Sequence, residues 1–200
     1  MSVVVTVKTP QSIYIGSDSA VTYAEESIII RPWTKIDRVN GLIFGCCGNP
    51  DHGSLFRSFL QMEDCFPKES TKDEMFELAA NFQAYLNEFG TGSQAKAGDI
   101  QSQFHVVFQD KAWSLENFYV HEITSYDSIG CGADYARTAL YLVDQKRFTD
   151  PYNGAVSALD AACALNAFCE YPLTLYHVQN DKTSKISIKD RSSAVIRENI

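Results

Sequence analysis

The spacing of apolar residues changes along the chain from the period of strands to that of helices and back, and this change most constrains the fold. Up to residue 50, apolar residues alternate or run in short segments rich in Val, Ile and Tyr, as strands do. Helical spacing follows over 55–89, strand patterns return over 104–123, helical spacing recurs over 133–169, and strands close the chain. This order differs from the strict strand–helix alternation of a doubly wound fold.

Turn residues divide the strand patterns into hairpins. Thr9, Pro10 and Gln11 predict a three-residue turn, and Asn40-Gly41 predicts a two-residue turn. The expected strands are 3–7, 12–18, 27–30, 33–39, 42–47, 104–108, 112–116, 117–123, 173–178 and 185–188.

Each helical region divides into two amphipathic helices. The apolar faces lie at 55–60 and 75–89 in the first region, and at 133–143 and 155–169 in the second. Two antiparallel sheets packed face to face, with one helix pair on each outer side, accommodate this order. We therefore predict an α+β fold, a four-layer αββα sandwich.

The length and composition favour one domain. The 200 residues are 45% hydrophobic, which is enough for one substantial core. We predict a single domain over 1–188 and a polar C-terminal tail over 189–200.

The charge and hydropathy patterns exclude several partners. The net charge of −8 argues against a nucleic-acid partner, which needs clustered Lys and Arg. No apolar run is long enough to span a membrane, and the first residues lack the pattern of a signal peptide. We expect a cytoplasmic protein with no membrane partner.

The cysteine spacing argues against both disulfides and metal binding. The six cysteines are at 46, 47, 65, 131, 163 and 169, mostly within apolar stretches. No CxxC pair or Cys/His ligand spacing occurs, so we expect reduced core thiols and no metal site. Cys46 and Cys47 are adjacent in a strand and should point to opposite faces, either packing or lining a small apolar pocket.

The first predicted hairpin places a carboxylate beside a serine at the start of the chain. With a turn at 9–11, Lys8 faces Ser12 and Ser2 faces Asp18. Methionine before a small residue is commonly removed, which would leave Ser2 with a free α-amine beside its own hydroxyl. An α-amine has a reference pKa of about 7.7 to 8.0 and suits the role of base for that hydroxyl.

Lys35 is the residue that we expect to lower the pKa of the Ser2 α-amine. A neighbouring ammonium lowers the pKa of an amine, and Asp18 is placed to pair with Lys35. Spacing alone favours a surface Ser2, a turn aspartate at 18 and a solvated lysine at 35, because charged residues are mostly exposed.

Several segments together resemble the proteasome β-subunit and bacterial HslV peptidase group of N-terminal nucleophile hydrolases. They are the strand after Ser2, GSDSAVT (16–22), TKIDRVNG (34–41), GCCGNPD (45–51), SIGCGADYA (128–136) and LYHV (175–178). The resemblance spans about residues 2–178 and implies the same αββα sandwich, with no cofactor.

The resemblance also implies residue roles. Ser2 matches the nucleophile, which is usually Thr, Asp18 matches the aspartate that orients the lysine, and Lys35 matches that lysine. Gly48 matches the backbone N–H donor to the tetrahedral oxyanion. The implied reaction is peptide-bond hydrolysis through a seryl ester.

Three supporting positions depart from the family pattern. Cys131 stands where Ser is usual, Asn166 where Asp is usual, and Cys169 where proteasome subunits have Ser. Asn keeps the hydrogen-bonding shape of Asp but removes its charge, which weakens stabilisation of a protonated amine.

The resemblance further implies a peptide or unfolded protein as substrate, assembly into a homo-oligomeric ring, and an ATP-dependent unfoldase as a possible partner. Two other functions remain open. The departures at Cys131 and Asn166 favour a catalytically inactive ring or scaffold protein, and N-terminal nucleophile enzymes also include amidases for small non-peptide substrates.

Overall fold

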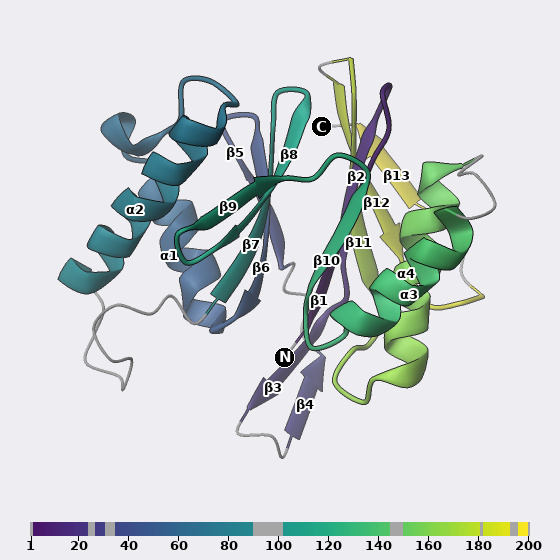
Figure 1. Cartoon of the computed structure of the whole chain (residues 1–200). Coiled ribbons are helices and arrows are strands. Elements are labelled where there is room, and N and C mark those ends of the chain that lie inside the picture. The colour runs from purple at the N-terminus through teal and green to yellow at the C-terminus, as the bar shows by residue number, and fades with distance from the viewer. Residues whose placement is uncertain are drawn as a thin grey trace.

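The predicted four-layer αββα sandwich is present in the computed structural model. It describes residues 2–23, 27–30, 35–89, 102–144, 150–180, 182–192 and 196–199. Two antiparallel sheets pack face to face, and each is covered on its outer side by two helices (Figure 1). No helix within these ranges is long and apolar enough to cross a bilayer.

The first sheet has the strand order β10-β1-β2-β11-β12-β13. Its strands are β10 (Tyr126–Gly130), β1 (Val3–Lys8), β2 (Ile13–Ser17), β11 (Leu173–Gln179), β12 (Lys182–Ile188) and β13 (Ile196–Asn199). The segment predicted as a polar tail thus contains β13, which pairs with β12 and extends this sheet.

The second sheet has the order β5-β6-β7-β8-β9. Its strands are β5 (Ile36–Val39), β6 (Leu42–Gly48), β7 (Ser102–Phe108), β8 (Lys111–Glu116) and β9 (Tyr119–Glu122). The predicted turn at Asn40-Gly41 is confirmed, and both residues have the positive φ that such a turn requires. Residues 33 and 34 of the predicted strand 33–39 lie outside the described residues.

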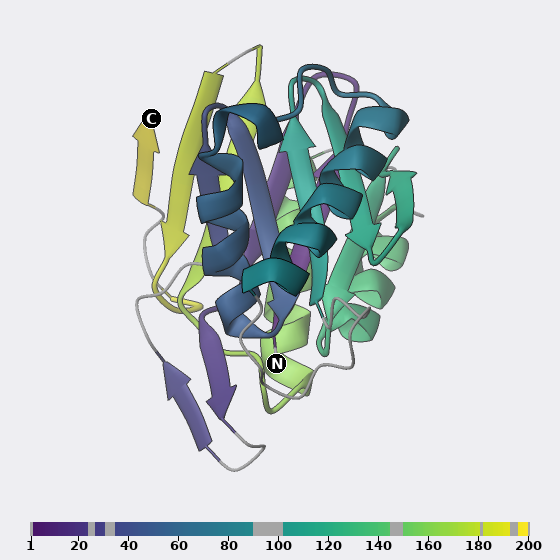
Figure 2. The same cartoon turned by 90° about the vertical axis from the view of Figure 1, so that its left-hand side faces the viewer.

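A separate pair, β3 (Ala20–Tyr23) and β4 (Ser27–Ile30), extends away from the sandwich near the N-terminus (Figures 1 and 2). Strand 27–30 was expected from the sequence, whereas β3 was not. β3 directly follows the turn that carries Asp18.

Both predicted helix pairs are present. They are α1 (Pro50–Leu60) and α2 (Lys72–Phe89), with the short η1 (Glu63–Cys65) between them, and α3 (Ala133–Asp144) and α4 (Pro151–Leu165). Because α4 ends at Leu165, Cys169 of the expected apolar face 155–169 lies outside the helix. The side chains of Asn49 and Asp150 cap the first turns of α1 and α4, and a proline follows each cap.

Three apolar clusters hold the layers together. One joins α1 and α2 to the second sheet, one joins α3 and α4 to the first sheet, and the third fills the space between the sheets. Cys46 belongs to the first cluster and Cys47 to the third, so the prediction that they point to opposite faces is confirmed.

The predicted register of the first hairpin is wrong by one residue. Lys8 pairs with Ile13 and Val4 pairs with Ser17, so the strand position opposite Asp18 is that of Val3 rather than Ser2. The loop has four residues instead of three, because the Thr9 hydroxyl and backbone bond to Ser12 and close it. Because the side chain of Thr9 closes the loop, the pairing of β1 with β2 is shifted by one residue from the predicted register.

Candidate active site

Ser2 lies just before β1 and is buried, with 6% of its surface exposed. β1 lies between β10 and β2, so the chain leading to Ser2 is fixed on both sides. Met1 lies outside the described residues. Ser2 is therefore held by a central strand of the sheet.

Asp18 is fully buried, and both oxygens of its carboxylate accept hydrogen bonds. One oxygen accepts the backbone N–H of Val3 at 2.9 Å and the ammonium of Lys35 at 2.6 Å. The other accepts the N–H of Ala20 at 3.0 Å and that of Glu170 at 3.3 Å. The carboxylate thus joins the residue after Ser2 to Lys35 in one rigid arrangement.

Lys35 reaches Asp18 from the second sheet. It precedes β5, and its carbonyl accepts the N–H of Cys46 at 3.0 Å, which fixes its backbone against β6. Its side chain is 10% exposed. A buried ammonium that is paired on one side and open to a cavity on the other is well placed to influence a neighbouring amine.

A cavity of about 270 Å³ opens beside Ser2. Its walls include Ser2, Lys35, Cys46 and Gly48, and the N-terminal half of α1 forms one side. At its border, Asp37 and Arg57 form an ion pair at 2.9 Å. Gly48 has a φ of +120°, a backbone conformation that few residues except glycine adopt.

The turn after β10 surrounds the carbonyl of Ser2. The N–H of Gly132 donates to that oxygen at 3.3 Å, and the thiol of Cys131 donates to it at 3.4 Å. Gly130 approaches so closely that a Cβ there would collide with the same oxygen. The N–H of Gly130 donates to the side-chain oxygen of Gln103 in β7 at 3.0 Å, which ties this turn to the second sheet.

Asn166, at the end of α4, supports the same turn. Its amide nitrogen donates to the Cys131 carbonyl at 2.8 Å, and its amide oxygen accepts the N–H of Phe168 at 2.9 Å. The thiol of Cys131 also approaches that oxygen at 3.9 Å. Asn166 therefore acts through Cys131 and the turn, and the structure gives it no direct bond to Ser2.

The fold was compared with known proteins. No family model and no curated protein sequence matches the chain. Among solved structures, BPH from Thiobacillus denitrificans in complex with epoxomicin superposes with a TM-score of 0.78 at 15% identity, over 88% of this chain and 98% of that one. HslV from Trypanosoma brucei gives a TM-score of 0.71 at 14% identity, over 89% of this chain and 99% of that one.

A third structure, Anbu (ancestral beta-subunit) from Yersinia bercovieri, gives a TM-score of 0.67 at 16% identity, over 94% of this chain and 88% of that one. The chain has the HslV-like, proteasome-type fold. The fold expected from the sequence is thereby confirmed.

Within this HslV-like fold, the residues singled out from the sequence come together in two groups. Ser2, Lys35 and Gly48 line one cavity, and Asp18 bonds to Lys35 behind it. Cys131 and Asn166 form the second group, which meets the first at the carbonyl of Ser2.

Sequence reasoning missed β10 and the polar residues that anchor it to the second sheet. The segment around 128–132 was interpreted only as a glycine turn, although Tyr126, Ser128 and Gly130 alternate with Asp127 and Ile129 in a short strand. Gln103 carried no recognisable signal. Its role depends on a contact between residues 27 positions apart.

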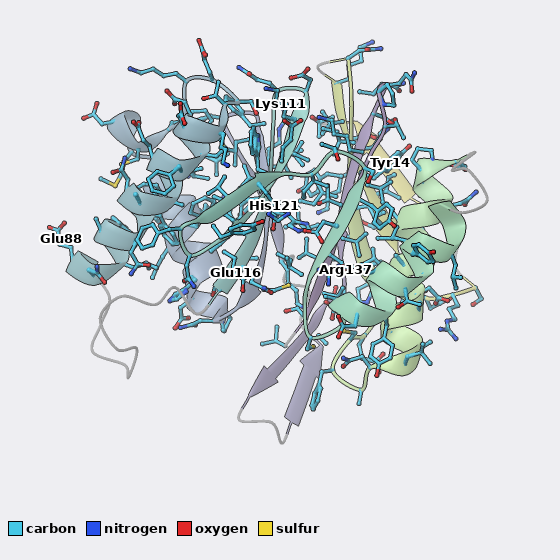
Figure 3. The ribbon with its side chains drawn as sticks, in the orientation of Figure 1. Tyr14, Glu88, Lys111, Glu116, His121 and Arg137 are labelled. Atoms are coloured by element: carbon cyan, nitrogen blue, oxygen red, sulfur yellow. The ribbon has the colours of Figure 1, made fainter. Side chains whose placement is uncertain are left out.

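A polar cluster around the buried His105 also anchors β10 in this HslV-like fold. Asp127 lies 3.1 Å from Arg137, 3.5 Å from His105 and 3.4 Å from His121, and His105 bonds to Thr6 of β1 at 2.9 Å. The side chains of His121 and Arg137 extend from opposite sides toward β10 (Figure 3).

Burial and neighbouring groups shift the pKa values of His105 and Asp127 in this cluster. Full burial lowers the pKa of His105 despite the neighbouring carboxylate. Burial opposes ionisation of Asp127, but its bonds to His105 and Ser128 and the charge of Arg137 hold the pKa of its carboxyl well below the usual range. An anionic Asp127 is therefore the stable form at neutral pH.

Proposed function

We propose that this protein is an N-terminal nucleophile peptidase in which Ser2 hydrolyses peptide bonds. The observation that carries the proposal is the position of Lys35, which is ion-paired with buried Asp18 and lines the same cavity as Ser2. A lysine held in this way supplies a fixed positive charge at the point where a terminal amine would act as base.

The proposed reaction begins once the residues before Ser2 are removed, which leaves a free α-amine. That amine takes the proton of the Ser2 hydroxyl while the oxygen attacks the substrate carbonyl and forms a tetrahedral intermediate. The N–H of Gly48 is assigned to the resulting oxyanion. Collapse of the intermediate expels the substrate amine, which takes the proton, and leaves a seryl ester.

Water completes the cycle. The α-amine removes a proton from a water molecule, which attacks the ester, and the proton returns to the Ser2 oxygen as the acid product leaves. Lys35 keeps the amine neutral between steps, because an ammonium disfavours a second positive charge nearby.

The cavity beside Ser2 is proposed to bind the substrate side chain next to the cleaved bond. Its lining is partly apolar, from Phe44, Val21 and Cys46, and partly charged, from the Asp37–Arg57 ion pair. A cavity of about 270 Å³ suits one side chain of moderate size.

The decisive experiment is covalent labelling with epoxomicin, the peptide epoxyketone present in the BPH complex. A hydroxyl and an amine on one residue can attack its ketone and its epoxide respectively. We expect intact-mass analysis to show one adduct, located at Ser2, on protein whose N-terminal residue is Ser2.

Two variants control this experiment. Ser2→Ala should abolish the adduct, whereas Ser54→Ala, which removes another hydroxyl at the cavity, should retain it. Absence of an adduct on chains that begin at Ser2 would reject the peptidase.

A non-catalytic scaffold is the second candidate function. Asn166 in place of a carboxylate and Cys131 in place of a serine favour it, because both weaken polar support of the Ser2 amine. Retention of Met1 in protein purified from its own host, together with no labelling, is the result expected of a scaffold.

We also propose that the protein assembles into a homo-oligomer, as the resemblance to ring-forming peptidases implies. On the outer surface of α3, Tyr135, Tyr141 and Leu142 are 41%, 54% and 59% exposed. Large apolar side chains exposed together on one helix are typical of a protein–protein contact surface. Light scattering after size exclusion should give a multiple of 22.3 kDa, and a monomer would contradict the assembly. A partner unfoldase stays a prediction from the resemblance.

A further inference from the structure

Two thiols from distant parts of the chain meet next to Ser2. Cys131 lies in the turn after β10, and Cys169 lies in the loop between α4 and β11. The two thiols are close enough for each to shift the pKa of the other. The Cys169 sulfur also lies 2.7 Å from the position that a Cβ on Gly132 would occupy, which places it against the turn that holds Cys131.

Asn166 holds both cysteines in place. Its side chain bonds to the carbonyl of Cys131 at 2.8 Å, and its backbone carbonyl accepts the N–H of Cys169 at 3.1 Å. One residue therefore positions both cysteines.

The two thiols differ in accessibility and acidity. Cys131 is partly exposed, and its interaction with Cys169 lowers the pKa of its thiol against the effect of burial. Cys169 is fully buried, and its contact with Cys131 and its burial raise the pKa of its thiol. Cys131 is therefore the more accessible and more acidic thiol of the pair, and Cys169 is the protected one.

The other described cysteines lack this combination. Burial raises the pKa values of Cys46, Cys47, Cys65 and Cys163. Selective oxidation should therefore begin at Cys131, because thiolate character and exposure govern reactivity toward oxidants.

We propose that Cys131 and Cys169 form a peroxide-sensitive pair whose disulfide switches off the Ser2 site. The effect on Ser2 rests on the proposed function, whereas the formation of the disulfide does not.

The oxidant is a hydroperoxide, and the reaction with hydrogen peroxide balances in two steps. The Cys131 thiolate attacks one peroxide oxygen, the O–O bond breaks, and the hydroxide that leaves takes a proton to become water, so that Cys131 becomes a sulfenic acid. The Cys169 sulfur then attacks the Cys131 sulfur, its own proton leaves with the hydroxyl as a second water, and an S–S bond forms. A dithiol reductant reverses the oxidation by thiol–disulfide exchange.

The disulfide disturbs Ser2 through its carbonyl. An S–S bond of about 2.05 Å draws the Cys131 sulfur toward Cys169 and consumes its S–H, so the donation to the Ser2 carbonyl is lost. The turn that contacts the same oxygen through Gly132 must move with it. Displacement of a reacting group by about 1 Å costs on the order of 10²-fold in rate.

Peptide mapping without reductant tests the disulfide directly. Trypsin places Cys131 in peptide 112–137, and Cys163 and Cys169 together in peptide 148–182. After treatment with hydrogen peroxide, we expect these two peptides to be linked, with the loss of two hydrogen atoms, and to separate again with dithiothreitol.

Matched variants identify the partner within peptide 148–182. Cys163→Ser should retain the link and Cys169→Ser should lose it. If Cys169→Ser does not fold, fragmentation of the linked peptides from the unmodified chain still assigns the bond. Oxidation of Cys131 to sulfinic acid with no link, or a link through Cys163, would overturn the proposal.

The switch is tested by the rate of epoxomicin labelling before peroxide, after peroxide and after dithiothreitol. We expect the rate to fall about 10²-fold and to recover. An unchanged rate in protein whose peptides are linked rejects the switch. Protein that is never labelled when reduced rejects the peptidase instead, and in that case linkage of the peptides still decides whether the cysteine pair exists.

Discussion

The ammonium of Lys35 lies 2.6 Å from a carboxylate oxygen of Asp18, and the two side chains come from different sheets. The same oxygen accepts the N–H of Val3, the residue after Ser2. The ion pair therefore fixes the proposed nucleophile relative to the wall of its cavity. Its expected contribution is to the stability of the site and, in the proposed peptidase, to its chemistry.

Asp18→Asn should strongly destabilise the protein, because it leaves the Lys35 ammonium buried without its counter-charge. Removing one member of a buried pair costs about 3–5 kcal/mol. Urea unfolding measures the loss. Asp37→Asn is the matched control, since its pair with Arg57 is largely exposed and should be worth about 1 kcal/mol or less. Equal costs for the two variants would show that the Asp18 pair is not effectively buried.

Gly130→Ala should destabilise the fold far more than Gly41→Ala. The φ angles of the two glycines are +92° and +89°, so the backbone strain of an added Cβ is the same. A Cβ at Gly41 meets nothing within 4 Å, whereas one at Gly130 collides with Ser2 and Cys47. We expect Gly130→Ala to cost about 1–3 kcal/mol more and to prevent labelling of Ser2. Chemical denaturation gives the difference, and equal losses would contradict it.

Gly53→Ala should stabilise α1 while narrowing the cavity. An added Cβ would lie 3.6 Å from that of Cys46, an ordinary contact, and alanine within a helix is favoured over glycine by about 0.5–1 kcal/mol. Thermal unfolding should show the gain. With a series of peptides, we expect kcat/KM for large side chains to fall about tenfold relative to small ones. An unchanged ratio would show that the cavity does not bind the side chain next to the cleaved bond.

Stability should fall as the pH drops below about 6.5 because of His105. Burial lowers its pKa in the folded state, so below the unfolded value the unfolded chain binds a proton that the folded chain resists. The groups that face His105 are Asp127, His121 and Arg137. His105→Gln removes the titration and should flatten the loss of unfolding free energy between about pH 7 and pH 5, measured with urea. The same slope in both proteins would assign the loss to other groups.

Local sequence signals predicted much of this architecture. The four helices within 50–89 and 133–165 and the turn at Asn40-Gly41 depend on residues close together in the chain. The placement of Cys46 and Cys47 on opposite faces follows from the period of a strand alone.

Other features could not be predicted because they depend on contacts between distant segments. β10 is a short strand whose pairing with β1 is reinforced by Gln103, His105 and His121 of the second sheet. The first hairpin was placed one residue out of register, since the closure of its loop by Thr9 and Ser12 has no clear signature in the sequence.

The sequence by itself determined the order of strands and helices, the two-sheet sandwich and the choice of Ser2, Asp18 and Lys35 as a candidate group. Periodicity and capping depend on residues that are close in the sequence, so they can be recognised without the tertiary structure. Only the tertiary structure decided that the turn of Gly130 and Gly132 surrounds the Ser2 carbonyl and that Cys131 meets Cys169 there. Those contacts join separate segments, and packing of the helices and sheets, rather than local preference, brings them together.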